Sequence, residues 1–220
     1  MYTPSHFSEA DGERIAALID QYGFATLISS NADELQITHA PVQLDRTRGV
    51  HGTLIGHIAR ANPHVALLRD GMEIVVLFHG PHTYISPAWY VDEDPRIPNV
   101  PTWNYLAVHV HGRIRRIEDA TQKWKIVTGL AAQYERGSAE PWVPADPARH
   151  ADKLGAIVGF EVDIERIEGK FKLSQNRSLA DQQGVIVKLE ARTAADDREM
   201  AALMRENVAR RTEPTSGIAR

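Results

Sequence analysis

Cysteine is absent from the 220 residues of this chain. Its absence excludes disulfide bonds and thiolate metal sites, and it favours a reducing compartment such as the cytoplasm. No segment approaches the roughly 18 consecutive apolar residues that a membrane-spanning helix needs. The N-terminus also lacks the basic and apolar regions of a signal peptide, so we expect a cytoplasmic protein with no membrane partner.

Short catalytic and nucleotide-binding fingerprints are missing as well. The chain contains no GxGxxG, GxxxxGK[ST] or GxSxG, which argues against a Rossmann site, a P-loop and a hydrolase elbow. His109 and His111 share one face of a predicted strand, but no metal-site signature accompanies them, and we expect no metal. The net charge of −4 argues mildly against broad DNA binding and leaves room for a local basic patch.

The composition is that of a globular protein, with 43% hydrophobic and 25% charged residues. A chain of this length holds one sizeable core, and we expect a single domain over residues 1–212. The remaining residues, 213–220, include Pro, Ser and Gly and are expected to form a flexible tail.

Apolar periodicity places strands in the middle of the chain and helices at both ends. The predicted strands cover residues 24–30, 35–44, 49–59, 72–78, 105–115 and 156–164. The predicted helices cover residues 8–22, 119–136, 178–190 and a stretch that begins near 193. A β-barrel with peripheral helices satisfies this order of elements.

One predicted strand changes the phase of its apolar residues. Leu35 and Ile37 alternate with polar residues at odd positions, whereas Ala40, Val42 and Leu44 continue at even positions. Such a slip predicts a β-bulge, which often re-aims groups beside an active site. An ordinary proline of an edge strand, at position 41, explains the pattern about as well.

The stretch from Phe78 to Tyr105 is the most distinctive part of the sequence. It contains two of the four tryptophans, together with histidines, tyrosines and prolines, and it includes an acidic loop that begins at Asp92. Aromatic side chains with polar tips on a proline-stiffened backbone are typical of a pocket for a flat ligand or of a protein interface. The alternative is that these rings only seal one end of a barrel.

Two further segments could hold an anion. Asn62 is a candidate N-cap, with Pro63 at the first helical position and Arg60 beside it, a combination that suits a phosphate. The segment 168–176 places two Lys, Ser, Gln and Asn directly after a strand. A common helix start and a solvated turn are the alternative interpretations of these segments.

These segments together carry a resemblance to a known family. The motifs, in chain order, are the opening MYTPSHF, GHIARANP (56–63), FHGPHTYISPAWY (78–90), VPTWNY (100–105) and KFKLSQN (170–176). In this order they resemble the PaiB family of FMN-binding negative transcriptional regulators, across most of residues 1–210. The resemblance implies an α+β fold, a split β-barrel like that of pyridoxamine phosphate oxidase with peripheral helices. It also implies FMN as cofactor and a homodimer, with DNA as a partner by family analogy alone.

The resemblance also implies which residues bind FMN. The phosphate is expected near His57, Arg60 and Asn62, and the ring along the segment from His39 to Val42. The full predicted set is His39, Ala40, Val42, His57, Arg60, Asn62, Ser86, Trp89, Trp103, Asn104, Lys170, Gln175 and Asn176. Part of this set could come from the second subunit. Two other functions stay open: a flavin-dependent oxidoreductase on the same barrel, and a flavin-free interaction module.

Overall fold

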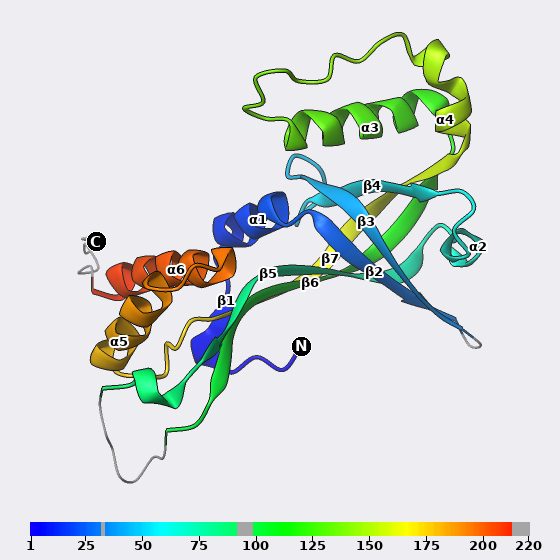
Figure 1. The fold of residues 1–220 in the computed structure, drawn as a ribbon. Helices are drawn as coiled ribbons and strands as arrows, with labels where there is room; N and C mark the ends of the chain where they lie inside the picture. The colour runs from blue at the N-terminus through cyan, green and yellow to red at the C-terminus, as the bar shows by residue number, and fades with distance from the viewer. Residues whose placement is uncertain (32–33, 92–98, 213–220) are drawn as a thin grey trace, which may run out of the picture. The chain divides into compact units, whose positions relative to one another are not determined.

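A computed structural model describes residues 1–31, 34–91 and 99–212 (Figure 1). The strands are β1 (Ser8–Glu9), β2 (Phe24–Ser30), β3 (Leu35–Asp45), β4 (Thr53–Ala59), β5 (Met72–Ile85), β6 (Thr102–Ile117) and β7 (Ile157–Lys172). The α-helices are α1 (Gly12–Gln21), α2 (His64–Leu67), α3 (Ala120–Tyr134), α4 (Ala151–Gly155), α5 (Leu179–Glu190) and α6 (Ala195–Thr212), with short 3-10 turns at Ser5–Phe7, Pro87–Trp89 and Pro147–His150. Residues 92–98 of the acidic loop, which was predicted from Asp92 to Pro101, and the predicted tail at 213–220 lie outside the described residues.

The chain divides into two compact units. The barrel unit comprises residues 10–79 and 108–168, and the terminal unit comprises Met1–Glu9, Gly80–Ala107 and the chain from Gly169 onward. Strands β5, β6 and β7 contribute residues to both units.

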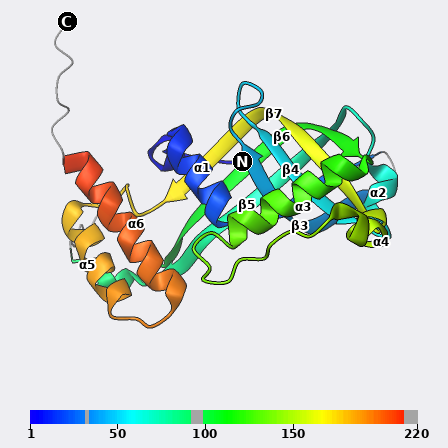
Figure 2. The ribbon, with the colours of Figure 1, turned by 90° about the horizontal axis from the view of Figure 1, so that it is seen from above.

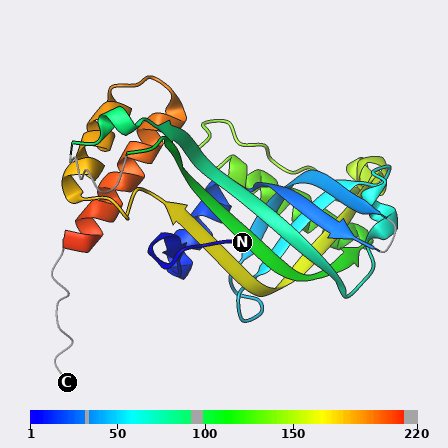
Figure 3. The same ribbon diagram turned by 90° about the horizontal axis from the view of Figure 1, so that it is seen from below.

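The strands form one sheet with the order β1-β7-β4-β3-β2-β5-β6, and an additional pairing joins β7 to β6. This last pairing closes β2 to β7 into a barrel, in which β5, β6 and β7 run side by side (Figure 3). The chain therefore forms an antiparallel barrel with helices, as the predicted α+β class requires. No helix within the described ranges is long and apolar enough to cross a membrane.

Alternating side chains fill the barrel. Buried positions include Leu27 on β2, Val110 on β6 and Phe160 on β7. Outside the barrel, α3 lies across β3 and β4 (Figure 2). There Ile126 and Leu130 of α3 pack with the hydrophobic side chains of the strands below, so that this part of the sheet is covered on both faces.

The terminal unit contains the helix pair α5 and α6, which pack against each other (Figure 1). Val185 and Leu189 of α5 and Met200 of α6 are fully buried. Ser178 caps α5, since its side chain accepts a hydrogen bond from the Asp181 N–H at 3.0 Å, as the predicted start of this helix requires.

Helix α1 is shorter than predicted. It was expected to begin at residue 8, but Ser8 lies in β1 and the helix begins at Gly12. Asp11 is the N-cap, since its carboxylate accepts hydrogen bonds from the N–H groups of Glu13 and Arg14. A carboxylate that accepts two otherwise unpaired N–H groups is a strong start signal.

The bulge predicted in the second strand is wrong. The pairing of β2 with β3 keeps one register from Phe24↔Pro41 to Ser30↔Leu35, with no extra residue. Thr38, Ala40 and Val42 face the core, whereas Leu35 and Ile37 are 60% and 54% exposed. The phase slip in the sequence therefore reflects apolar residues on the outer face of the barrel.

Candidate functional site

The predicted cofactor-binding residues fall into two groups. The barrel unit holds His39, Ala40, Val42, His57, Arg60 and Asn62. The terminal unit holds Ser86, Trp89, Trp103, Asn104, Lys170, Gln175 and Asn176.

Strand β3 can offer its backbone to a ligand. Ala40 and Val42 are buried in the core, so their side chains cannot line an external pocket. The ladder of β3 with β4 covers only Val42 to Asp45 among the described residues. The residues of β3 before Val42 therefore pair with β2 on one side. On the other side they are not part of the ladder between β3 and β4.

His57 on β4 carries an unsatisfied polar atom. Its Nδ1 is buried and has no hydrogen-bond partner among the described residues. Burial lowers the pKa of His57, so that the imidazole stays neutral at pH 7. A buried nitrogen without a partner is costly for a fold, and a ligand that supplies a phosphate or hydroxyl group can satisfy it.

A hydrogen-bond network fixes the turn that follows β4. The Asn62 side chain accepts from the His64 N–H at 2.9 Å and donates to Thr38 Oγ1 at 3.1 Å. The His64 ring contacts Thr38 Oγ1 through Nδ1 at 2.9 Å and Ser29 Oγ through Nε2 at 2.6 Å. Burial lowers the pKa of His64. This network joins β2, β3 and α2, and it places Asn62 beside the residue that precedes His39.

The predicted helix start is displaced by one residue. Helix α2 begins at His64 and has only four residues, although Asn62 still accepts the His64 N–H and Pro63 has helical dihedral angles. A single turn presents a weaker dipole than a long helix, so a phosphate here would depend more on side chains.

Arg60 is held by several acceptors. Its guanidinium donates to the carbonyls of Gly155 at 2.8 Å and Ile157 at 3.1 Å, and it pairs with Glu118 at 2.5 Å. The Arg60 contact, together with that of Arg116, lowers the pKa of Glu118 to about 2. A phosphate at Arg60 must therefore compete with an ionised carboxylate.

The terminal unit contains an exposed aromatic group. Trp103 is 52% exposed, and its ring lies 6.1 Å from that of Tyr84 and 6.2 Å from that of His82. Lys172 donates to the Trp103 carbonyl at 2.5 Å, and burial, with a smaller effect of Lys170, lowers the pKa of Lys172 to about 8. Lys170 is buried, with its ammonium 5.1 Å from the Tyr105 ring centre.

Other predicted residues of this unit have internal partners. Asn104 is fully buried and donates to Ser174 Oγ at 3.0 Å. The Gln175 amide donates to the Phe171 carbonyl at 2.5 Å and accepts from the Leu173 N–H at 2.7 Å. Their polar groups therefore hold the segment after β7.

Asn176 is exposed. The two remaining residues of the predicted set, Ser86 and Trp89, belong to the aromatic stretch from Phe78 to Tyr105. Ser86 accepts from the Ala88 N–H at 3.3 Å and caps the Pro87–Trp89 turn. Trp89 lies 5.8 Å from the Arg192 guanidinium. The acidic loop that was predicted to separate Trp89 from Trp103 lies outside the described residues.

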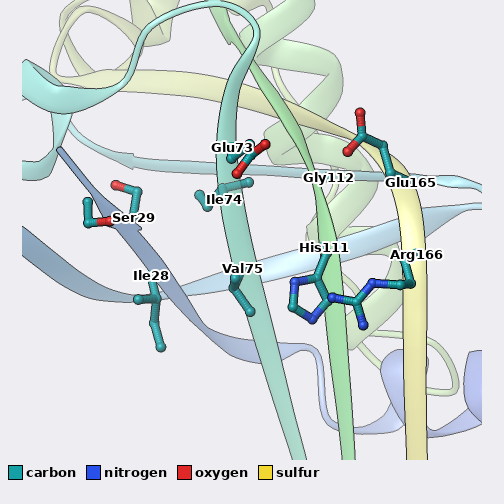
Figure 4. A pocket seen from close by; sticks show the side chains of 10 residues that line it. Ile28, Ser29, Glu73, Ile74, Val75, His111, Gly112, Glu165 and Arg166 are labelled. Atoms are coloured by element: carbon teal, nitrogen blue, oxygen red, sulfur yellow. The ribbon is translucent and has the colours of Figure 1, made fainter. Parts of the chain in front are cut away.

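A cavity of about 320 Å³ opens at the end of β2 in the barrel unit (Figure 4). Its charged lining residues are Glu73, His111, Glu165 and Arg166. Arg113 pairs with both glutamates, and Glu168 pairs with His111 at 3.1 Å and Arg166 at 2.6 Å. Both arginines are paired with carboxylates, so within the described residues this cavity offers no free guanidinium to a phosphate.

Three residues of the hydrogen-bond network around His64 were not predicted from the sequence: Ser29, Thr38 and His64 itself. Their network is visible only once β2, β3 and α2 are placed side by side. The signal available in the sequence was a histidine directly after the Asn-Pro pair.

Comparison with known proteins places these features in a family. A family model described as "Putative FMN-binding domain" matches residues 1–166. The Bacillus subtilis "Protease synthase and sporulation protein PAI 2" is 32% identical over 210 residues, which cover 94% of this chain and 98% of that protein. The chain belongs to the PaiB-type FMN-binding family. The resemblance found in the sequence is thereby confirmed, and membership assigns FMN as the cofactor.

Solved structures support the fold of this PaiB-type protein. The flavocytochrome Anf3 from Azotobacter vinelandii matches with a TM-score of 0.56 and 16% identity, covering 75% of this chain and 69% of that one. The FAD and heme binding protein from Mycobacterium smegmatis matches with a TM-score of 0.53 and 14% identity, covering 75% and 73%. The predicted split-barrel fold is confirmed.

The buried His64 network predicts a pH-dependent stability. The folded pKa of His64 lies below its ordinary 6.5, so the unfolded chain takes up a proton first as the pH falls. The free energy of unfolding should therefore decrease from pH 7.5 to pH 5.5. His64→Gln should show a smaller decrease in urea titrations, and the exposed His51→Gln should behave as wild type. An equal decrease in all three proteins would contradict this role.

Proposed function

We propose that this protein binds FMN on the barrel unit, with the phosphate near His57, Arg60 and Asn62 and the ring along His39 to Val42. The observation that carries this proposal is the buried Nδ1 of His57 on β4, the strand that pairs with β3, which has no hydrogen-bond partner among the described residues. A ligand can supply the hydrogen-bond partner that this nitrogen lacks. FMN, when bound, supplies redox chemistry or a flavin-dependent signal.

The protein's own residues have distinct parts in this proposal. Neutral His57 donates a hydrogen bond to a phosphate oxygen. Asn62 holds the turn between β4 and α2 through its hydrogen bond to Thr38 Oγ1. The main chain of His39 to Val42 meets the polar edge of the ring. A role in FMN binding stays a prediction for the residues of the terminal unit, such as Trp89, Trp103 and Lys170.

Arg60 and Glu118 offer a pair of opposite tests. Arg60→Ala should weaken FMN binding by about ten- to a hundred-fold, because a hydrogen bond to a charged group contributes about 1.5–3 kcal/mol. Glu118→Gln should strengthen binding, because it removes the carboxylate that competes for Arg60. Dissociation constants from flavin fluorescence titrations check both changes.

Arg46→Ala is the matched control. Like Arg60, Arg46 forms salt bridges on the barrel unit, here with Glu13 and Asp20 at 2.9 Å. Its removal should leave FMN affinity unchanged. Folded Arg60→Ala and Glu118→Gln proteins with wild-type affinity would remove Arg60 from the phosphate site.

We also propose that the protein is a homodimer. Phe24 is 70% exposed, and Leu35 and Ile37 of β3 are more than half exposed. Ile28 lies opposite both Ile37 and Val75 in the sheet, so apolar side chains continue across β3, β2 and β5. An exposed apolar sheet face of this kind is typical of a protein interface. It supports the predicted dimer, with a second copy of this chain as the partner.

A charge on this face should separate the subunits. Ile37→Glu should shift the protein towards monomer in sedimentation velocity runs at micromolar concentration, because burying an unpaired carboxylate is costly. Val50→Glu is the control, because Val50 is 93% exposed and lies outside β2, β3 and β5. A monomeric wild-type protein, or a dimeric Ile37→Glu variant, would contradict this interface.

Negative transcriptional regulation is the role we propose for this flavoprotein. The support for this role is the 32% sequence identity with the Bacillus subtilis protein over 94% of this chain. Sequence-specific DNA binding, measured by fluorescence anisotropy on fragments of its own promoter and on shuffled duplexes of equal length, should be saturable and specific. Equal affinity for both duplex types, together with turnover of reduced nicotinamide, would instead favour a flavin-dependent oxidoreductase.

A further inference from the structure

A second cavity lies in the barrel unit between α3 and the strands that it covers. Its volume is about 260 Å³. Its floor is formed by Ile55 of β4, Ile117 of β6 and Ile126 of α3, and its rim carries Gln43 of β3 and Gln122 and Lys125 of α3. Figure 2 shows α3 running across β3 and β4 at this place.

The floor and rim differ in chemistry. Ile117 and Ile126 are buried in one hydrophobic cluster, against which Ile55 packs. Ile55 is partly exposed, with the buried Ile117 and Ile126 beside it, and such an apolar lining favours a small apolar group over a polar one. The floor therefore selects for a hydrocarbon or aromatic body.

The polar groups at the rim are available for a ligand. Within the described parts of the chain, Lys125 has no carboxylate at ion-pair distance and no hydrogen-bond acceptor, and the amides of Gln43 and Gln122 make no side-chain hydrogen bond. One ammonium and two amides can together hold a carboxylate or a sulfonate.

The carboxylate in the wall of the cavity does not cancel this preference. Glu161 is buried and accepts two bonds from Arg48, at 2.7 and 2.8 Å, and a further one from Arg115. These arginines, Arg48 above all, lower the pKa of Glu161 and balance its charge. With Lys125, the local charges favour an anion.

Gly129 keeps the cavity open on the helix side. A Cβ at this position would lie 2.8 Å from Gln43 Oε1. The missing side chain lets the Gln43 amide approach the helix, and Gly129 itself lines the cavity. A larger residue at 129 would fill this space.

We propose that this cavity binds a small organic anion with a flat apolar body, such as an aromatic carboxylate. The body lies on the three isoleucines, and the anionic group meets Lys125 and the two amides. The volume is below the roughly 300–1,000 Å³ of sites for drug-sized ligands, so the ligand is small. This second site does not require that FMN be bound.

The probe is 2-naphthoate, titrated by calorimetry into the full-length protein, with neutral 2-naphthamide as the matched ligand. Naphthoate should bind saturably with one site per chain. Lys125→Met should weaken naphthoate about two- to five-fold, as expected for an exposed ion pair, without changing the affinity for naphthamide. Gly129→Leu should abolish binding of both. Lys188→Met, an exposed lysine of α5, should match wild type.

Three results would overturn the inference: no saturable naphthoate binding, unchanged binding in folded Gly129→Leu, or equal loss in Lys125→Met and Lys188→Met. A parallel FMN titration separates this proposal from the previous one. Naphthoate binding without FMN binding would contradict the proposed function and support this site. FMN binding without naphthoate binding would do the reverse.

Discussion

Closure of the barrel between β6 and β7 is the constraint on which the rest of the barrel unit depends. At Gly112 of β6, a Cβ atom would lie 2.3 Å from the Asp163 carbonyl of β7. No side chain fits at this distance, so the two strands can meet only because this residue is glycine. The closed sheet then fixes the positions of β3 and β4, and with them the buried Nδ1 of His57, which has no hydrogen-bond partner in the part of the chain that the structure describes.

Ion pairs between distant strands reinforce this closure. Arg48 and Arg115 converge on Glu161, and Arg113 bridges Glu73 and Glu165. Exposed pairs of this kind contribute little one by one. Glu161 differs because it is buried, and removing one of its partners would leave a charge in a poorly hydrated place. Glu161 also lines the cavity between α3 and the strands, so this arrangement sets part of the charge around that cavity.

The sequence predicted the parts of the structure that depend on local chemistry. The predicted helix starts at residues 119 and 178, where Asp119 and Ser178 are the N-caps, needed only neighbouring residues, as did the strand from Phe24 to Ser30 and the family motifs. It failed where the outcome depended on a distant element. The apparent bulge at His39 arose because Leu35 and Ile37 face outward, which a single strand cannot reveal. Likewise, the Arg60–Glu118 pair joins residues 58 positions apart.

The lysines at the end of β7 have a chemical consequence of their own. Burial lowers the pKa of Lys172 to about 8 from an ordinary value near 10.5. At pH 7 about a tenth of these side chains are then neutral amines, against fewer than about one in a thousand for a free lysine. A neutral amine is nucleophilic, and this one lies against the carbonyl of an exposed tryptophan. Burial therefore makes the charge of Lys172 depend on pH in a range where an exposed lysine stays fully protonated.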